Sequence, residues 1–208
     1  LDHCDFLNNS AGNLGGGSML FASRGAGGNV SISNCSYKEN QAEDGAAFAL
    51  WPSGFLTINH VSIDNCVFEK NSSSKYIVSI TALPKSKTSL CEITRANMFE
   101  RNLSGVLGSG FVIEMLKEGN LVVSESRFIS NKKDYIIHIS EFSKATMNNC
   151  IFGLNTGNKI VYATSNIDTI IFDNLLLHDN LINSQFSSGT IFIRYSSQFT
   201  GTNFAFVG

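Results

Sequence analysis

The sequence predicts an all-β fold, a right-handed parallel β-helix of about seven coils that takes up residues 1–208 as one domain. Three observations predict it. An aromatic residue with Asn three positions later returns at a nearly constant interval. The residues before each aromatic alternate with a period of two, which is typical of strands. The chain also holds 22 Asn, 27 Ser and 18 Gly, a composition that favours strands and turns over helices.

The repeated aromatic and Asn define the unit. The pairs are Phe6/Asn9, Tyr37/Asn40, Phe68/Asn71, Phe99/Asn102, Phe128/Asn131 and Phe152/Asn155, with a weaker Leu177/Asn180. The steps between successive Asn residues are 31, 31, 31, 29, 24 and 25. A unit of this length without a helical pattern cannot bury its own apolar face, so we expect it to stack on copies of itself.

The residues before each aromatic predict two short strands separated by a bend. Apolar residues stand seven and five positions before the aromatic, and a small residue usually stands two positions before it. The steps of two indicate a strand with one face inward, and the step of three indicates a bend or bulge. The pattern fails before Phe99, where Glu92 and Thr94 hold the apolar positions, so we expect that coil to be shifted by one residue or irregular.

A second apolar run follows each Asn and is long enough to form another strand. These runs are Ser18–Ala22, Ala46–Trp51, Tyr76–Ala82, Phe111–Leu116, Tyr135–Ile139, Ile160–Ala163 and Thr190–Tyr195. Hairpin dipeptides between the strands are nearly absent, with Asp44-Gly45 the one instance, which disfavours a β-sandwich.

Stacked coils lie about 4.8 Å apart, so the pattern predicts internal ladders of like residues. We expect the aromatic residues to form a core stack. We expect each Asn to lie at a bend in the left-handed backbone region and to bond the turn or the Asn of the next coil. Both ladders are therefore expected to be structural.

The five cysteines are expected to be buried free thiols. Cys4, Cys35 and Cys66 recur at intervals of 31 and Cys150 takes the same position again, whereas Cys91 stands off that register. Parallel side chains in register fit disulfide geometry badly. Since neither a Cys-x-x-Cys nor a Cys/His cluster is present, we expect no metal and no cofactor.

Charge and hydropathy exclude two classes of partner. With 15 Lys+Arg against 17 Asp+Glu and no basic run, we expect no nucleic-acid binding. The apolar runs are too short to span a bilayer, so we expect no membrane span in this segment.

The histidines and the tryptophan offer no site by pattern. We expect His3, His60, His138 and His178 to be solvated surface residues. Trp51 is expected to cover a coil; the alternative is a platform on which a sugar ring stacks.

Two longer motifs resemble a known family. FLNNSA at 6–11 precedes GGGSM at 15–19, and YKENQA at 37–42 precedes GAAF at 45–48. These segments resemble the Phe-x-x-Asn and Gly-Gly-Ala-Ile repeats of the polymorphic outer membrane protein family. The Phe-x-x-Asn half covers essentially the whole chain, and the Gly-rich half is clear only in the first two coils. The resemblance implies a surface or secreted right-handed β-helix, often a passenger or adhesin region, with no family catalytic residue to carry over.

Two functions of different classes remain. The first is a non-enzymatic extracellular or cell-surface module, a structural scaffold or an adhesin that binds a glycan or a surface protein. The alternative is a carbohydrate-active enzyme of the pectin lyase type, which requires paired or clustered carboxylates on one flank of the rod. The acidic residues fall at differing repeat positions, so we expect none of them to be catalytic. These residues are Glu92, Glu114, Glu125, Asp168 and Asp173.

The two ends of the sequence show no polar cap, at Leu1 or at the apolar residues 204–208. We therefore expect residues 1–208 to be a β-helix segment of a longer chain, continued by further coils or assembled end to end into a fibre.

The sequence holds five Asn-x-Ser/Thr sequons. Asn29 and Asn34 are the better candidates for glycosylation because they flank a strand.

Overall fold

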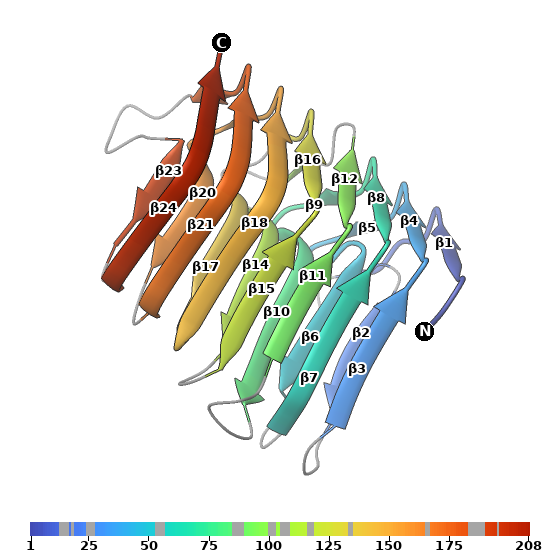
Figure 1. Cartoon of the computed structure of the whole chain (residues 1–208). Coiled ribbons are helices and arrows are strands. Elements are labelled where there is room, and N and C mark those ends of the chain that lie inside the picture. The colour runs from blue at the N-terminus through green and yellow to red at the C-terminus, as the bar shows by residue number, and fades with distance from the viewer. Residues whose placement is uncertain are drawn as a thin grey trace.

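The computed structural model of the chain describes residues 1–12, 17, 19–23, 28–52, 57–84, 90–99, 103–104, 109–115, 119–132, 135–164, 167–182, 190–194 and 196–208. These residues form a parallel β-solenoid with no helix, which confirms the predicted fold class. Figure 1 shows the strands stacked in chain order, with the N-terminus at one end of the stack and the C-terminus at the other. Among the described residues, then, no helix is present that could cross a membrane.

The strands before and around each aromatic form the largest face of the solenoid, called face A below. Its first half stacks β3 (Gly28–Ser33), β7 (Thr57–Asp64), β11 (Leu90–Thr94), β15 (Asn120–Ser124), β18 (Lys144–Gly153), β21 (Ile167–His178) and β24 (Ser196–Val207). Its second half stacks β1 (Asp5–Leu7), β4 (Ser36–Lys38), β8 (Val67–Glu69), β12 (Asn97–Phe99) and β16 (Arg127–Ile129) onto the later parts of β18, β21 and β24. All these pairings are parallel.

The runs after the Asn form the other two faces. The short face B holds β5 (Gln41–Ala42), β9 (Ser72–Ser73), β13 (Leu103–Ser104), β19 (Thr156–Gly157) and β22 (Leu181–Ile182). Face C holds β2 (Met19–Ser23), β6 (Phe48–Pro52), β10 (Tyr76–Pro84), β14 (Ser109–Met115), β17 (Tyr135–Ser140), β20 (Lys159–Thr164) and β23 (Ile191–Ile193). Each of the seven predicted apolar runs therefore contains a strand.

The number of coils is lower than predicted. A strand on face B closes a complete turn, and such strands occur in five coils of the described chain. About five complete turns thus replace the seven or so expected, because the first coil, the coil of β16 and β17 and the coil of β24 contribute no strand to face B among the described residues.

Left-handed backbone at two fixed positions makes the corners of each coil. The first position lies three residues before the core residue in register with the aromatic ladder: His3, Asn34, Asn65, Arg95, Glu125, Asn149, Asn174 and Asn203. The second lies two residues after it: Asn8, Glu39, Lys70, Ser130, Leu154 and Asp179. The predicted bend in the three-residue step is therefore present. Among the described residues the ladder Asn itself does not adopt positive φ; the residue before it does, which corrects the expected conformation.

The irregular coil is shifted by one residue. Met98, not Phe99, is the register partner of Phe68 and Phe128, whereas Phe99 is the partner of Glu69 and Ile129. Phe99 is therefore not at the core position predicted for it. Cys91 is the register partner of Val61, so it lies off the register of the other cysteines, as expected.

The core is a column of apolar side chains that runs through the coils. All five cysteines are free, as expected, and Cys35, Cys66, Cys91 and Cys150 are buried while Cys4 is half-buried. Each thiol of the repeat position donates to the carbonyl two residues earlier, as Cys35 Sγ does to Ser33 O at 3.0 Å. These thiols act as small core residues.

Candidate functional site

The Asn ladder is a continuous hydrogen-bond network inside the first coils. Asn40 Oδ1 accepts bonds from the backbone N and Nδ2 of Asn9 at 3.0 and 2.9 Å. Asn71 Oδ1 accepts the same two bonds from Asn40, both at 3.0 Å. Asn71 Nδ2 donates to Tyr37 O at 2.8 Å. Since Asn40 and Asn71 are fully buried, their amides are committed to the neighbouring coils.

The ladder resumes in the later coils. Asn155 Oδ1 accepts from the backbone N and Nδ2 of Asn131 at 3.0 and 3.2 Å, and Asn180 Oδ1 accepts the equivalent bonds from Asn155. Asn102 lies outside the described residues. The buried amide of Asn155, whose Nδ2 also donates to Phe128 O at 2.7 Å, is thus used within the solenoid.

The aromatic ladder is a stack of nearly parallel rings. The ring centroids of Phe6 and Tyr37 lie 4.8 Å apart and those of Tyr37 and Phe68 lie 5.2 Å apart. Phe128 and Phe152 stack at 4.8 Å with an interplanar angle of 5°. Because these rings fill the interior, a binding surface has to be sought on the outer positions.

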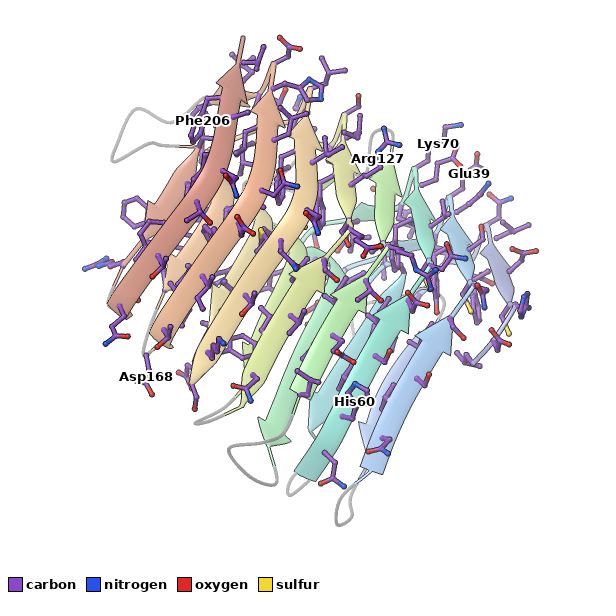
Figure 2. All side chains as sticks on the ribbon, in the orientation of Figure 1. Glu39, His60, Lys70, Arg127, Asp168 and Phe206 are labelled. Carbon is purple, nitrogen blue, oxygen red and sulfur yellow. The ribbon has the colours of Figure 1, made fainter. Side chains whose placement is uncertain are left out.

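Most of the described carboxylates join neighbouring coils. Asp64 bonds Arg95, with Arg95 Nε 3.0 Å from Asp64 Oδ1, and accepts from Thr94 at 2.6 Å; the Arg95 bond is the main cause of the lowered pKa of Asp64. Glu92 Oε2 lies 2.8 Å from His60 Nε2 on face A, where Figure 2 labels His60.

Asp173, Asp168 and Glu125 lie at three different repeat positions of face A and its corners. Asp173 accepts bonds from Thr202 and Asn203 at 2.6 and 2.8 Å, which lower its pKa. Asp168 and Glu125 are exposed on other columns, and Figure 2 shows Asp168 at the strand ends of face A. The side chain of Glu114 lies outside the described set. Within the described residues no cluster of three or more His, Cys, Asp or Glu forms a metal site.

Asp44 is the one carboxyl group among the described residues that is buried without full pairing. It is 5% exposed, and its Oδ1 has no hydrogen-bond partner. Lys75 Nζ stands 4.0 Å from Oδ2. Burial raises the pKa of Asp44 to about 6, and Lys75 offsets only part of that effect. Gly45, with φ of +60°, makes the turn that holds the carboxyl group inward.

Asp44→Asn is expected to stabilise the fold near neutral pH. The pKa rises from 3.8 in the unfolded chain to about 6 in the folded one, so the folded state binds the extra proton. Stability conferred by the protonated form is present below pH 4 and is lost as pH rises through 6. We expect the variant to gain about 2 kcal/mol at pH 7.5 and nothing at pH 3.5, measured by urea unfolding. Asp168→Asn, which removes an exposed charge, is the control; equal gains from both variants would contradict the burial argument.

The strongest surface feature is an aromatic patch on the outer side of face C, formed by Tyr135, His138, Lys159, Tyr162 and Phe192. The ring centroids of Tyr135 and Tyr162 lie 4.5 Å apart, and those of Tyr162 and Phe192 lie 5.6 Å apart. Lys159 Nζ lies 5.4, 5.1 and 5.0 Å from the ring centroids of Tyr135, Tyr162 and Phe192. Three rings thus share one ammonium group.

His138 belongs to this patch and is not the solvated histidine that was expected. Its ring stacks on Tyr162 at 4.8 Å, and Nε2 lies 3.0 Å from Thr164 Oγ1. Burial lowers the pKa of His138 to about 4. The imidazole is therefore neutral at physiological pH, and the ammonium of Lys159 is the cationic group of the patch.

No family model, curated protein or solved structure matches this chain. The structure shows the parallel β-solenoid, and no family match confirms the resemblance to the polymorphic outer membrane protein repeat. The geometry of the chain itself therefore has to indicate its function.

The repeat pattern does not reveal the patch because the inward residues define that repeat. His138 and Tyr162 stand 24 residues apart, the same step as from Asn131 to Asn155, and are register partners. Aromatic residues that recur at outward positions are the sequence signal that identifies this pair.

The sequons lie in different environments. Asn29 is exposed on β3. Asn34 is exposed as well, but its Nδ2 donates to Asp2 Oδ1 at 2.8 Å and its Oδ1 accepts from Asn65 at 2.8 Å. Asn71 is fully buried. Of the two predicted acceptors, Asn29 therefore has the freer amide.

Proposed function

We propose that this chain is a non-enzymatic extracellular or cell-surface module, a rigid β-solenoid scaffold that presents an adhesive surface. The observation that carries the proposal is the aromatic patch on face C. Half-buried rings offer a large apolar contact area at a small cost in conformational entropy, and the ladders beneath hold them in fixed positions.

The chemistry of the patch fits a glycan ligand. The ring edges and the outer face of Phe192 offer apolar contacts to the C–H groups of a sugar, and the Lys159 ammonium is a donor for hydroxyl or carboxylate oxygens. Lys159 is 8% exposed, so a ligand must approach closely to reach it. A protein surface that offers apolar and acidic groups is a second class of partner for the same chemistry.

The rival function is a carbohydrate-active enzyme, and Asp44 is the observation that favours it. A general acid needs a raised pKa and a second carboxylate at a suitable distance. Glu43, the neighbouring acid, is instead paired with Lys75 at 3.2 Å between Oε1 and Nζ. Hydrolysis of a polysaccharide by the chain, abolished in Asp44→Asn, would establish the rival.

The test of the adhesive surface is a glycan array followed by affinity measurement with the tightest glycan. Tyr162→Ala is expected to weaken that binding about tenfold, because a stacked aromatic contact contributes on the order of 1 kcal/mol or more. Tyr76→Ala is the matched control, since Tyr76 is half-buried on face C but two coils from Tyr135. If both variants bind as the unmodified chain does, or if no glycan binds, the proposed glycan-binding site is wrong.

A further inference from the structure

Lys159 is a nearly buried cation whose hydrogen-bond donors are unused. It begins β20 and is 8% exposed. No salt bridge or hydrogen bond joins its ammonium group to any residue that the structure describes, and its contacts are the three ring faces at 5.0 to 5.4 Å. A ring face attracts the charge, but it offers no oxygen to accept the N–H groups. A buried charge is costly without such acceptors, so the patch lacks one component.

The ammonium group of Lys159 is still reachable from outside. Among the described side chains, the polar atoms that are both shielded from solvent and without a partner belong to Tyr37, Asp44 and Asn148. Lys159 Nζ is not one of them, so it keeps contact with solvent. The patch also lies on the side of the rod, where β17, β20 and β23 stack side by side on face C (Figure 1). Further coils at either end would therefore not cover it.

The ring faces of the patch are turned to one another, which leaves ring edges for a ligand. Tyr135 and Tyr162 stack with an interplanar angle of 24°, and His138 stacks on Tyr162 at 28°. These contacts come from the preceding coil, and Phe192 approaches Tyr162 from the following one. The edge of an aromatic ring carries a partial positive charge. The groups that the patch presents outward therefore favour negative charge.

A second cation lies beside the patch. Arg194 is exposed, and its backbone N donates to Ala163 O at 2.9 Å. The alternation of strand residues places Arg194 on the same outward side of face C as Phe192. Because His138 is neutral, the charges of the patch and of this neighbouring position are both positive, which selects for an anionic partner.

One acidic sugar ring can meet both features of the patch. Such a sugar carries its carboxylate or sulfate group beside C–H groups of the same ring, so anionic oxygens and apolar surface arrive together. Lys159 Nζ and the rings of Tyr135 and Tyr162 offer the complementary pair, a donor beside apolar edges. An acidic peptide brings the carboxylate without the rigid apolar ring.

We infer that the glycan bound by the aromatic patch is acidic, a sugar chain whose carboxylate or sulfate oxygens accept hydrogen bonds from Lys159 Nζ. The inference rests on the proposed function, because it names the class of glycan for the same patch. Bonds to a charged group then fill the acceptor positions that the chain itself leaves empty.

Titration calorimetry with matched probes tests the inference. The pairs are sialyllactose and its methyl ester, galacturonate hexamer and its methyl ester, and sulfated and unsulfated galactan hexamer. At least one acidic probe is expected to bind at least about tenfold more tightly than its neutral counterpart, since a hydrogen bond to a charged group contributes more than one between neutral groups. The pair that shows the preference distinguishes a carboxylate from a sulfate. Hexaglutamate is expected to bind at least about tenfold more weakly than that acidic probe.

Lys159→Met is expected to remove the preference for the acidic probe, because Met keeps an unbranched apolar stem under the rings without the charge. Lys144→Met is the matched control, since Lys144 is exposed on face A, and should retain the preference. Circular dichroism checks that both variants are folded, and the comparison of probes on the unmodified chain stands without them.

Three outcomes would overturn the inference: equal binding within every pair, a preference that survives in Lys159→Met, or hexaglutamate binding as tightly as the acidic glycan. Failure of the proposed function looks different. If neutral glycans bind as tightly as acidic ones and Tyr162→Ala weakens both, the acidic ligand is wrong while the adhesive surface stands. If neither these probes nor any glycan of the array binds, the glycan-binding site itself is wrong.

Discussion

Asn71→Ala is expected to lower the free energy of unfolding by about 3–6 kcal/mol. The change leaves the backbone N–H and the side-chain amide of Asn40 without the oxygen that both bond at 3.0 Å, and it leaves Tyr37 O without its donor at 2.8 Å. Each buried group left unpaired costs about 1–3 kcal/mol. Urea unfolding followed by circular dichroism measures the loss.

Asn29→Ala is the matched control for this loss. It removes the same amide from an exposed strand position, so we expect a change within about 0.5 kcal/mol. A loss at Asn71 no larger than that at Asn29 would show that the ladder bonds add nothing beyond what water supplies in the unfolded chain. The buried amide network would then specify the register of the coils without stabilising them.

The fold was predictable from the sequence because each coil repeats its constraints. The core position held by Phe68 requires an apolar residue in every coil, and the position three residues later requires a side-chain amide. Both requirements persist when the loops change in length, so the repeat can be recognised in the sequence. A shift in the coil of Phe99 was expected from Glu92 and Thr94, but Phe99 was wrongly kept at the core position because Met98 and Phe99 are both apolar. The alternation of Cys91 and Ile93 points to Met98, but the match of Phe99 to the aromatic pattern outweighed it.

The outer surface was predictable only in part. The environment of His138 depends on Tyr162 and Thr164 in the next coil, so its burial follows from the register of face C. The aromatic and Asn repeat depends on the inward residues of face A and on its corners. It therefore does not indicate which outward residues of face C are neighbours. Asp44 stands out in the sequence for its turn dipeptide, but its burial depends on residues of neighbouring coils, which the sequence does not place next to it.

Phe128→Ala is expected to destabilise the fold by about 3–5 kcal/mol, the usual cost of removing a large ring from a packed core. Phe128 is fully buried and stacks on Phe152 at a centroid distance of 4.8 Å. The surrounding coils cannot collapse into the space, because each is fixed by strand pairing on both sides. Thermal and urea unfolding measure the loss.

Phe206→Ala is the control for this variant because Phe206 takes the same repeat position in the last coil. It is 62% exposed there, so we expect a loss below about 1 kcal/mol in the chain of residues 1–208. The difference between the two losses in the free energy of unfolding then measures the stability that a ring gains from a neighbouring coil packed on its second side. Equal losses at both sites would mean that the ring is stabilised by its own coil alone, and stacking between coils could not be what holds the solenoid together.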